Sequence, residues 1–170
     1  MKKFHTYYFL WILMLLVFGC QRDDLCPEDT PTTPSLNIDF LDFSNPAIAK
    51  NVSNLSIKAQ NEDEFLPLGD EGDTIISSTN SILIPLRTDN NTTVYDFIIN
   101  DNEGNVVNVD QLIFNYNTKE IYINRACGFK VEYENFDAIL TQDDNRWISS
   151  IDVIEDEIVD ESITHVQILF

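Results

Sequence analysis

Short segments in which apolar and polar residues alternate follow one another from residue 36 to residue 170. The clearest is "FKVEYEN", where Phe129, Val131 and Tyr133 fall on one face and charged residues fall on the other. A two-residue period is typical of a strand with one buried face. The segments that we expect to form strands are 36–43, 51–59, 81–87, 93–100, 105–109, 111–116, 120–126, 129–135, 146–154 and 163–170, with 73–77 a weaker candidate.

Polar stretches between these segments predict the connections. Residues 44–50 are turn-like, and "DNEG" at 101–104 is a good turn because it combines short polar residues with a glycine. The polar "NTK" at 117–119 predicts the turn of a hairpin between the segments on its two sides.

Two of the expected strands contain an irregularity. Pro85 lacks the N–H that a ladder needs, which places its strand at an edge or a bulge. Ile38 and Phe40 share one face of their segment, but Leu41 and Phe43 shift that alternation, which predicts a bulge.

The pattern contains no long segment with a helical period and end caps, and no internal repeat. Many short strands at regular spacing indicate a sandwich or a barrel. We therefore expect residues 36–170 to form one all-β domain. The favoured form is an antiparallel β-sandwich, Ig-like or similar, of about eight to ten short strands.

The first nineteen residues have a different character. Lys2 and Lys3 are followed by an apolar run over 9–18 and by the small Gly19. A positive start, a run of about ten apolar residues and a small residue describe a secretory signal. The alternative is a short membrane anchor, although the run is well below the ~20 apolar residues that a spanning helix needs. We expect residues 1–19 to be a cleaved signal peptide.

Cys20 stands directly behind Val17-Phe18-Gly19. This order resembles the lipobox of bacterial lipoproteins, in which the cysteine thiol receives a diacylglycerol and the leader is cut just before it. The resemblance implies that Cys20 is lipidated and that residues 20–35, rich in proline and small polar residues, form a tether. The alternative is an ordinary exported thiol near a conventional cleavage site.

If Cys20 carries lipid, Cys26 and Cys127 remain as an even number of cysteines in an oxidising compartment. A disulfide between them is the natural prediction, and two free thiols are the alternative. A metal site is not expected, because the sequence has no CxxC pair and only His165 remains as a histidine after cleavage.

The strong negative charge of the chain narrows its partners. The sequence has 10 basic and 29 acidic residues, and loss of Lys2 and Lys3 with the leader moves the net charge from −19 to −21. Phosphate contacts need clustered Lys and Arg, so nucleic acid is not an expected partner. The charge also disfavours adsorption to an anionic membrane surface.

Residues able to carry catalysis are sparse. A nucleophilic triad needs a histidine, and a lone strand histidine such as His165 is usually a partly exposed structural residue. A glycoside hydrolase needs only two carboxylates, a condition that an acidic chain meets trivially. We expect no catalytic residue and no cofactor.

Two acidic, glycine-containing loops and several aromatic residues are candidates for binding. "GDEGDT" at 69–74 and "DNEGN" at 101–105 could bind Ca²⁺ weakly, but neither has EF-hand spacing, and solvated turns are the simpler interpretation. Most of the aromatic residues are expected in the core, though an exposed face bearing tyrosines could hold a sugar or a peptide. These aromatic residues are Phe114, Tyr116, Tyr122, Phe129 and Tyr133.

The segments "CQRDDLCPEDTPTTP", "SILIPLRTD" and "YINRACGFKVEYENF" resemble an uncharacterised family of small Bacteroidota lipoproteins, a domain of unknown function. The resemblance covers most of the mature chain, includes Cys26 and Cys127, and implies a single lipoprotein domain without supplying an activity.

Two shorter signals are similar to export features of that phylum. Gln21-Arg22-Asp23-Asp24 is similar to a short signal that sends lipoproteins to the outer face of the outer membrane, with Arg22 where lysine is usual; an ordinary polar spacer is the alternative. Asp73-Thr74-Ile75 resembles an O-glycosylation site of exported proteins, which would modify Thr74.

These observations together predict a lipoprotein of the outer membrane, held by its N-terminal lipid and exposed at the cell surface. The expected role is non-enzymatic, as a binding or envelope-accessory module with a protein or glycan partner. A periplasm-facing structural subunit of an envelope complex is one alternative, and a carboxylate-dependent hydrolase is another.

Overall fold

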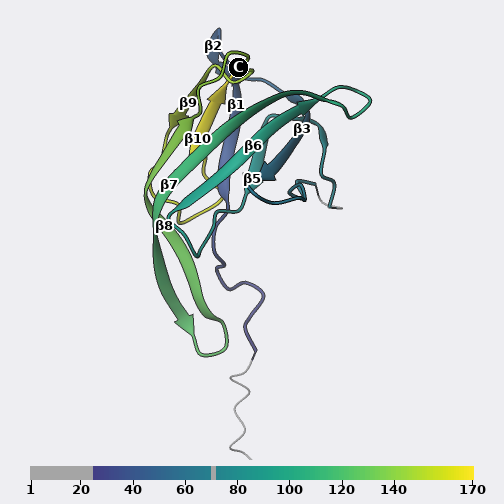
Figure 1. The fold of residues 1–170 in the computed structure, drawn as a ribbon. Helices are drawn as coiled ribbons and strands as arrows, with labels where there is room; N and C mark the ends of the chain where they lie inside the picture. The colour runs from purple at the N-terminus through teal and green to yellow at the C-terminus, as the bar shows by residue number, and fades with distance from the viewer. Residues whose placement is uncertain (1–24, 70–71) are drawn as a thin grey trace, which may run out of the picture. The chain divides into compact units, whose positions relative to one another are not determined.

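The computed structural model describes residues 25–69 and 72–170, and every regular element in these ranges is a strand (Figure 1). The ten strands are β1 (Leu36–Asp42), β2 (Asn45–Ala49), β3 (Val52–Ala59), β4 (Ile76–Thr79), β5 (Ser81–Ile84), β6 (Thr92–Asn100), β7 (Val106–Asn124), β8 (Gly128–Leu140), β9 (Ser150–Val153) and β10 (Val166–Leu169). The predicted signal peptide, Cys20 and residues 21–24 lie outside the described residues.

The chain divides into two compact units. The larger comprises Thr32–Ile121 and Lys130–Phe170, and the described part of the smaller comprises 25–31 and 122–129. The smaller unit holds the end of β7, the start of β8 and the turn between them. Each unit is described separately below.

The strands form two sheets that pack together, which confirms the predicted all-β sandwich. The first sheet has the order β2-β1-β10-β9, with β5 also paired to β1. The second has the order β4-β3-β6-β7-β8. Figure 1 shows β6 and β7 running side by side in the second sheet.

One pairing differs from the expected antiparallel arrangement. β1 and β10 are parallel neighbours, with Ile38 opposite Val166 and Phe40 opposite Ile168. The pairing places the first and last strands of the larger unit side by side. Alternation along a strand sets which side chains face the core but not the direction of its neighbour, so the pattern left this pairing undetermined.

Aromatic and aliphatic side chains from both sheets fill the space between them. Phe114 of β7 and Phe136 of β8 stack with ring centroids 5.7 Å apart. Fully buried side chains of the first sheet are Leu36, Ile38, Phe40, Ile84, Val166 and Ile168, and those of the second include Leu55, Ile57, Phe97, Leu112, Phe114 and Tyr133.

The turn expected at 44–50 is instead the exposed edge strand β2, so this prediction was wrong. β2 pairs with β1 through Leu41 and Ala49, and the register shifts between Leu41 and Asp42. The shift confirms the predicted irregularity in β1. Pro46 is compatible with an edge strand, where a missing N–H breaks no inner ladder.

The hairpin turn expected at 117–119 was also wrong, because β7 runs without a break for 19 residues. None of the three residues is a glycine or a proline, so nothing forces the chain to turn there. Lys119 instead lies across from Glu134 of β8, with Nζ 2.6 Å from Oε1. The chain turns later, between Asn124 and Gly128, where Gly128 has φ +75°.

His165 is fully buried, which corrects the expectation of a partly exposed residue. It precedes β10, and its N–H donates to the carbonyl of Asn37 at 3.0 Å, while its carbonyl accepts from Ile154 at 2.8 Å. Its ring Nδ1 accepts the N–H of Asn37 at 3.1 Å. Burial lowers the pKa of the imidazole. The negative charges of Glu155 and Asp160 act in the other direction and raise this pKa, but burial has the larger effect.

The buried imidazole predicts acid sensitivity. A folded-state pKa below the ordinary 6.5 means that the unfolded chain takes up the proton first, so stability falls as pH drops below 6.5. Protonation would also remove the Nδ1 acceptor used by Asn37. We expect urea unfolding to show less stability near pH ~5 than near pH ~7, with a smaller decline in His165→Gln. An imidazole pKa at or above 6.5, measured by NMR on the folded protein, would contradict this.

Candidate functional site

A polar cleft of about 370 Å³ opens beside the start of β6 in the larger unit. Its walls come from the end of β3 and the turn after it, from the segment that follows β5, and from the first residues of β6. The lining residues are Ala59, Gln60, Asn61, Glu62, Arg87, Asn90, Thr92, Thr93, Val94 and Tyr95.

The first wall is a tight turn that continues the pairing of β3 with β6. Ala59 pairs with Tyr95, and the N–H of Gln60 donates to the carbonyl of Val94 at 2.9 Å. The N–H of Glu62 then closes the turn on the carbonyl of Ala59 at 3.1 Å. Asn61 has φ +67°, a left-handed conformation that asparagine tolerates better than most residues.

The opposite wall begins after β5, which ends at Ile84 and not at Arg87 as expected, because Pro85 cannot donate to a ladder. The three carbonyls of 85–87 therefore lie outside the sheet ladder and need other donors. Three tyrosine hydroxyls, one from each of β6, β8 and β7, supply them, and we call this set the tyrosine clamp. Its hydrogen bonds run from Tyr95 to the carbonyl of Pro85 at 2.7 Å, from Tyr133 to Leu86 at 3.1 Å and from Tyr116 to Arg87 at 2.8 Å.

Burial keeps these hydroxyls protonated and able to donate. It raises the pKa of Tyr95 to about 12 and that of Tyr133 to about 12, and it also raises the pKa of Tyr116. The clamp residues belong to the second sheet, whereas β5 belongs to the first. The clamp therefore joins the two sheets at the edge of the cleft.

The main chain of Arg87 is held on both sides. Its N–H donates to Thr93 Oγ1 at 2.9 Å, and its carbonyl accepts from Tyr116. The Thr93 and Tyr116 hydroxyls also hydrogen-bond to each other. These hydrogen bonds form a closed ring that fixes the main chain of Arg87 at the cleft, independently of the conformation of its exposed side chain.

The guanidinium of Arg87 is paired with Asp89. Nε and Nη2 lie 2.9 Å from the two carboxylate oxygens, a bidentate contact. The hydrogen bonds from Arg87 hold the pKa of Asp89 below its ordinary value, and the same contact raises the pKa of Arg87. Because Asp89 offsets this charge, amide and hydroxyl groups dominate the polar chemistry of the cleft.

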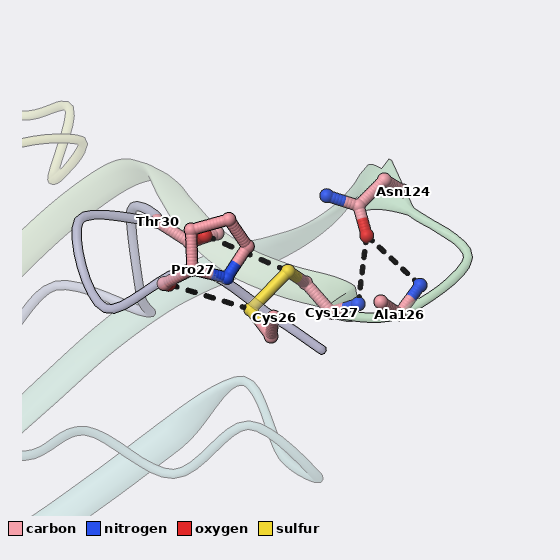
Figure 2. Close-up of a disulfide and its surroundings, with 6 residues drawn as sticks. All are labelled: Cys26, Pro27, Thr30, Asn124, Ala126 and Cys127. Carbon is pink, nitrogen blue, oxygen red and sulfur yellow. Dashed lines mark hydrogen bonds between the residues drawn. A yellow bond between two sulfur atoms is a disulfide. The ribbon is translucent and has the colours of Figure 1, made fainter. Parts of the chain in front are cut away.

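The structure joins Cys26 to Cys127 in the smaller unit, with Cα atoms 4.9 Å apart (Figure 2). Asn124 shapes the turn before Cys127, because its side-chain oxygen accepts the N–H groups of Ala126 at 2.9 Å and Cys127 at 2.8 Å. Thr30 Oγ1 lies 3.5 Å from Cys127 Sγ. The disulfide thus ties the segment that precedes β1 to the β7–β8 turn.

The remaining sequence candidates are not brought to the cleft. Thr74 is exposed in a bend before β4. The carboxylate of Asp101 accepts a hydrogen bond from the side-chain amide of Asn105 at 2.9 Å, which is the main cause of its lowered pKa, and it also accepts the N–H groups of Asn105 and Glu103, which complete the "DNEGN" turn. The loop at 69–74 includes residues 70–71, which lie outside the described ranges.

Asp110 is a fully buried carboxylate that sequence reasoning did not single out. Its Oδ2 accepts the N–H of Ile148 at 2.7 Å, and burial raises its pKa. Beside this contact the indole of Trp147 donates to the carbonyl of Phe97 at 3.2 Å. These two hydrogen bonds, from Ile148 to Asp110 and from Trp147 to Phe97, attach the segment that follows β8 to the second sheet.

Within 25–69 and 72–170, no group of three or more His, Cys, Asp or Glu side chains is arranged to hold a metal ion. The same ranges contain no helix long and apolar enough to cross a membrane.

Most of the five aromatic residues were expected in the core, and Phe114, Tyr116 and Tyr133 are buried, but the hydrogen bonds of the tyrosine hydroxyls were not expected. The available signal was Pro85, whose carbonyl and the two that follow must find donors outside a ladder. Which tyrosines supply them depends on strand order, which a two-residue pattern does not reveal.

A family model described as a family of unknown function (DUF6452) matches residues 54–170, more than half of the 170-residue chain. No curated protein and no solved structure matches the chain.

The tyrosine clamp predicts a specific loss of stability. Tyr133→Phe or Tyr95→Phe removes a donor from a carbonyl, at a cost of about 1–3 kcal/mol in the free energy of unfolding. Tyr122→Phe is the matched control, because the ring of Tyr122 is 59% exposed. Equal stability of all three variants and the wild type would contradict the clamp.

The same hydroxyls predict alkaline sensitivity. Tyr95 and Tyr133 deprotonate near pH 12 when folded but near ~10 when unfolded, so the unfolded chain binds fewer protons in between. Stability should therefore fall as pH rises from ~10 toward 12, and each Tyr→Phe change should flatten that slope in denaturant titrations.

Proposed function

The chain belongs to the family of unknown function DUF6452, and we propose that it is an outer-membrane lipoprotein acting as a non-enzymatic binding module. The polar cleft beside Arg87 is the proposed binding site. The proposed ligand is a neutral, hydroxyl-rich molecule, of which a glycan is the natural class.

The N-terminal residues support the membrane location. Cys20 has the position of a lipidated cysteine, and 21–24 resemble a surface-sorting signal of Bacteroidota lipoproteins. The Cys26–Cys127 disulfide fits an oxidising compartment outside the cytoplasm. Six residue steps separate Cys20 from Cys26, a reach of at most ~20 Å. The proposed anchor therefore holds the start of the chain close to the membrane.

The observation that carries the binding proposal is the tyrosine clamp. It holds one wall of the cleft through three main-chain hydrogen bonds, and the β3–β6 pairing holds the other. A preformed wall loses little conformational freedom when a ligand arrives, which favours affinity. A volume of about 370 Å³ lies within the range of ligand pockets, ~300–1,000 Å³.

The chemistry of the lining supports an uncharged polar ligand. Asn61, Asn90 and Gln60 present amides that can both donate and accept hydrogen bonds, as sugar hydroxyls require. Asp89 already pairs with the guanidinium of Arg87, which weakens the attraction for an anion. The net negative charge of the chain also disfavours an anionic ligand.

A hydrolase is the weaker alternative on the same residues. Glycoside hydrolysis needs two carboxyl groups that flank the bond. Among the residues that line the cleft, Glu62 alone carries a carboxylate. A single carboxylate supports binding over hydrolysis. The other alternative, a periplasm-facing structural subunit, would leave the cleft without a ligand.

The test is titration of the detergent-solubilised mature protein with neutral oligosaccharides, followed by calorimetry and by amide chemical shifts. We expect shifts confined to residues around the cleft. Asn90→Ala should weaken binding about fivefold, because one hydrogen bond to a ligand contributes on the order of 1 kcal/mol. Asn117→Ala, an exposed position on β7, is the matched control.

Two outcomes would contradict the proposal. One is the absence of binding by any neutral oligosaccharide, and the other is equal weakening by Asn90→Ala and Asn117→Ala. Release of reducing ends during the titration would instead favour the hydrolase.

A further inference from the structure

Two large aromatic side chains stand exposed at the tip of the β7–β8 hairpin, in the smaller unit. Tyr122 is 59% exposed and Phe129 is 64% exposed. Their rings meet edge to face with centroids 5.2 Å apart. Leu25, in the same unit, is 67% exposed. Because Tyr122 and Phe129 are exposed and in contact with each other, they form an apolar patch of the kind that marks an interaction surface.

The tip is stiffened around these side chains. The disulfide ties Cys127 in the turn to Cys26 of the lead-in segment, and Asn124 caps the turn through two main-chain N–H groups (Figure 2). Gly128 adopts φ +75°, which an L side chain rarely does, so the turn is built for this conformation. A stiff tip presents Tyr122 and Phe129 without an added ordering cost.

The covalent path from the tip leads to the proposed lipid anchor. Cys127 is bonded to Cys26, and Cys26 lies six residues from Cys20. The six steps span at most ~20 Å, and Phe129 is only two residues beyond Cys127. If Cys20 is lipidated, as the proposed function holds, the tip cannot move far from the membrane surface.

The chemistry of the tip suits the headgroup region of that membrane. Aromatic side chains concentrate at membrane–water interfaces, and tyrosine combines an apolar ring with a polar hydroxyl. Arg125, exposed in the same turn, can pair with a lipid phosphate. Glu28 and Asp29 in the lead-in segment disfavour an anionic surface, so a zwitterionic one fits better.

We propose that Tyr122 and Phe129 insert into the zwitterionic phospholipid headgroup interface of the membrane that holds the Cys20 lipid. The tip is then a second membrane contact, which the disulfide couples to the first. This inference rests on the lipid anchor of the proposed function and does not depend on what occupies the cleft.

The test places a tryptophan at the tip and measures its contact with lipid. Lipidated Phe129→Trp protein, purified from membranes of cells that express the full chain, is reconstituted into phosphatidylcholine–phosphatidylethanolamine vesicles with brominated acyl chains. Val107→Trp, on a 59% exposed position at the other end of β7, is the matched control, and the Trp147 signal of the wild type is subtracted from both.

The expected result is a blue shift and loss of most of the added emission for Phe129→Trp, with neither change for Val107→Trp. A version that also carries Cys26→Ser and Cys127→Ser should recover emission, because the tip is then no longer tied to the anchor. Tyr122→Trp serves as a second reporter if Phe129→Trp does not fold.

Failure of the two proposals can be told apart. If the protein floats with the vesicles but the tip tryptophan stays as unquenched as Val107→Trp, the inference about the tip is wrong. If the protein does not float, the lipid anchor is wrong. In that case Cys20, whose thiol is then free, is coupled to a maleimide-phospholipid in the vesicles. Quenching in that arm would uphold contact by the tip, and its absence would overturn it.

Discussion

The need to satisfy the carbonyls of 85–87 shapes the larger unit. Pro85 ends β5 and leaves three carbonyls outside the ladder, and the one that belongs to the buried Leu86 would be costly to leave unsatisfied. Tyrosines from three successive neighbours of the second sheet supply the donors. Since β5 belongs to the first sheet, the clamp couples the two layers and sets the position of Arg87. The cleft, and with it the proposed binding function, depends on this set of hydrogen bonds.

The buried polar residues follow the same rule. His165 accepts a main-chain N–H from Asn37 near the start of β1, whereas Asp110 and Thr93 each accept one from a segment between strands. Polar side chains in the core of this sandwich thus hydrogen-bond to main-chain groups near the ends of the strands. The polar groups that face solvent in the cleft remain available to a ligand.

Periodicity was sufficient to predict most strands and the shared inward face of Ile38 and Phe40 in β1. It could not give the parallel pairing of β1 with β10, because alternation carries no information on strand direction. It misread 117–119 as a turn and 44–50 as a loop, since polar residues occur on exposed strand faces and edges as well as in turns. The clamp and the cleft join residues from β3, β6, β7 and β8, and such a site follows only from the strand order.

The two units suggest a division of tasks. The smaller one links the lead-in segment to the β7–β8 turn through the disulfide, and it carries the exposed aromatic pair. The larger one holds the cleft. We propose that the smaller unit serves attachment and the larger unit recognition, and that the lipid on Cys20 determines where the whole chain is located.

Mass spectrometry of the intact mature chain, extracted from the membranes of cells that express it, tests that claim most directly. The account predicts a chain that begins at Cys20 and carries a diacylglycerol on its thiol, with residues 1–19 removed. A chain recovered with an unmodified Cys20, whether the leader is retained or cut elsewhere, would contradict it.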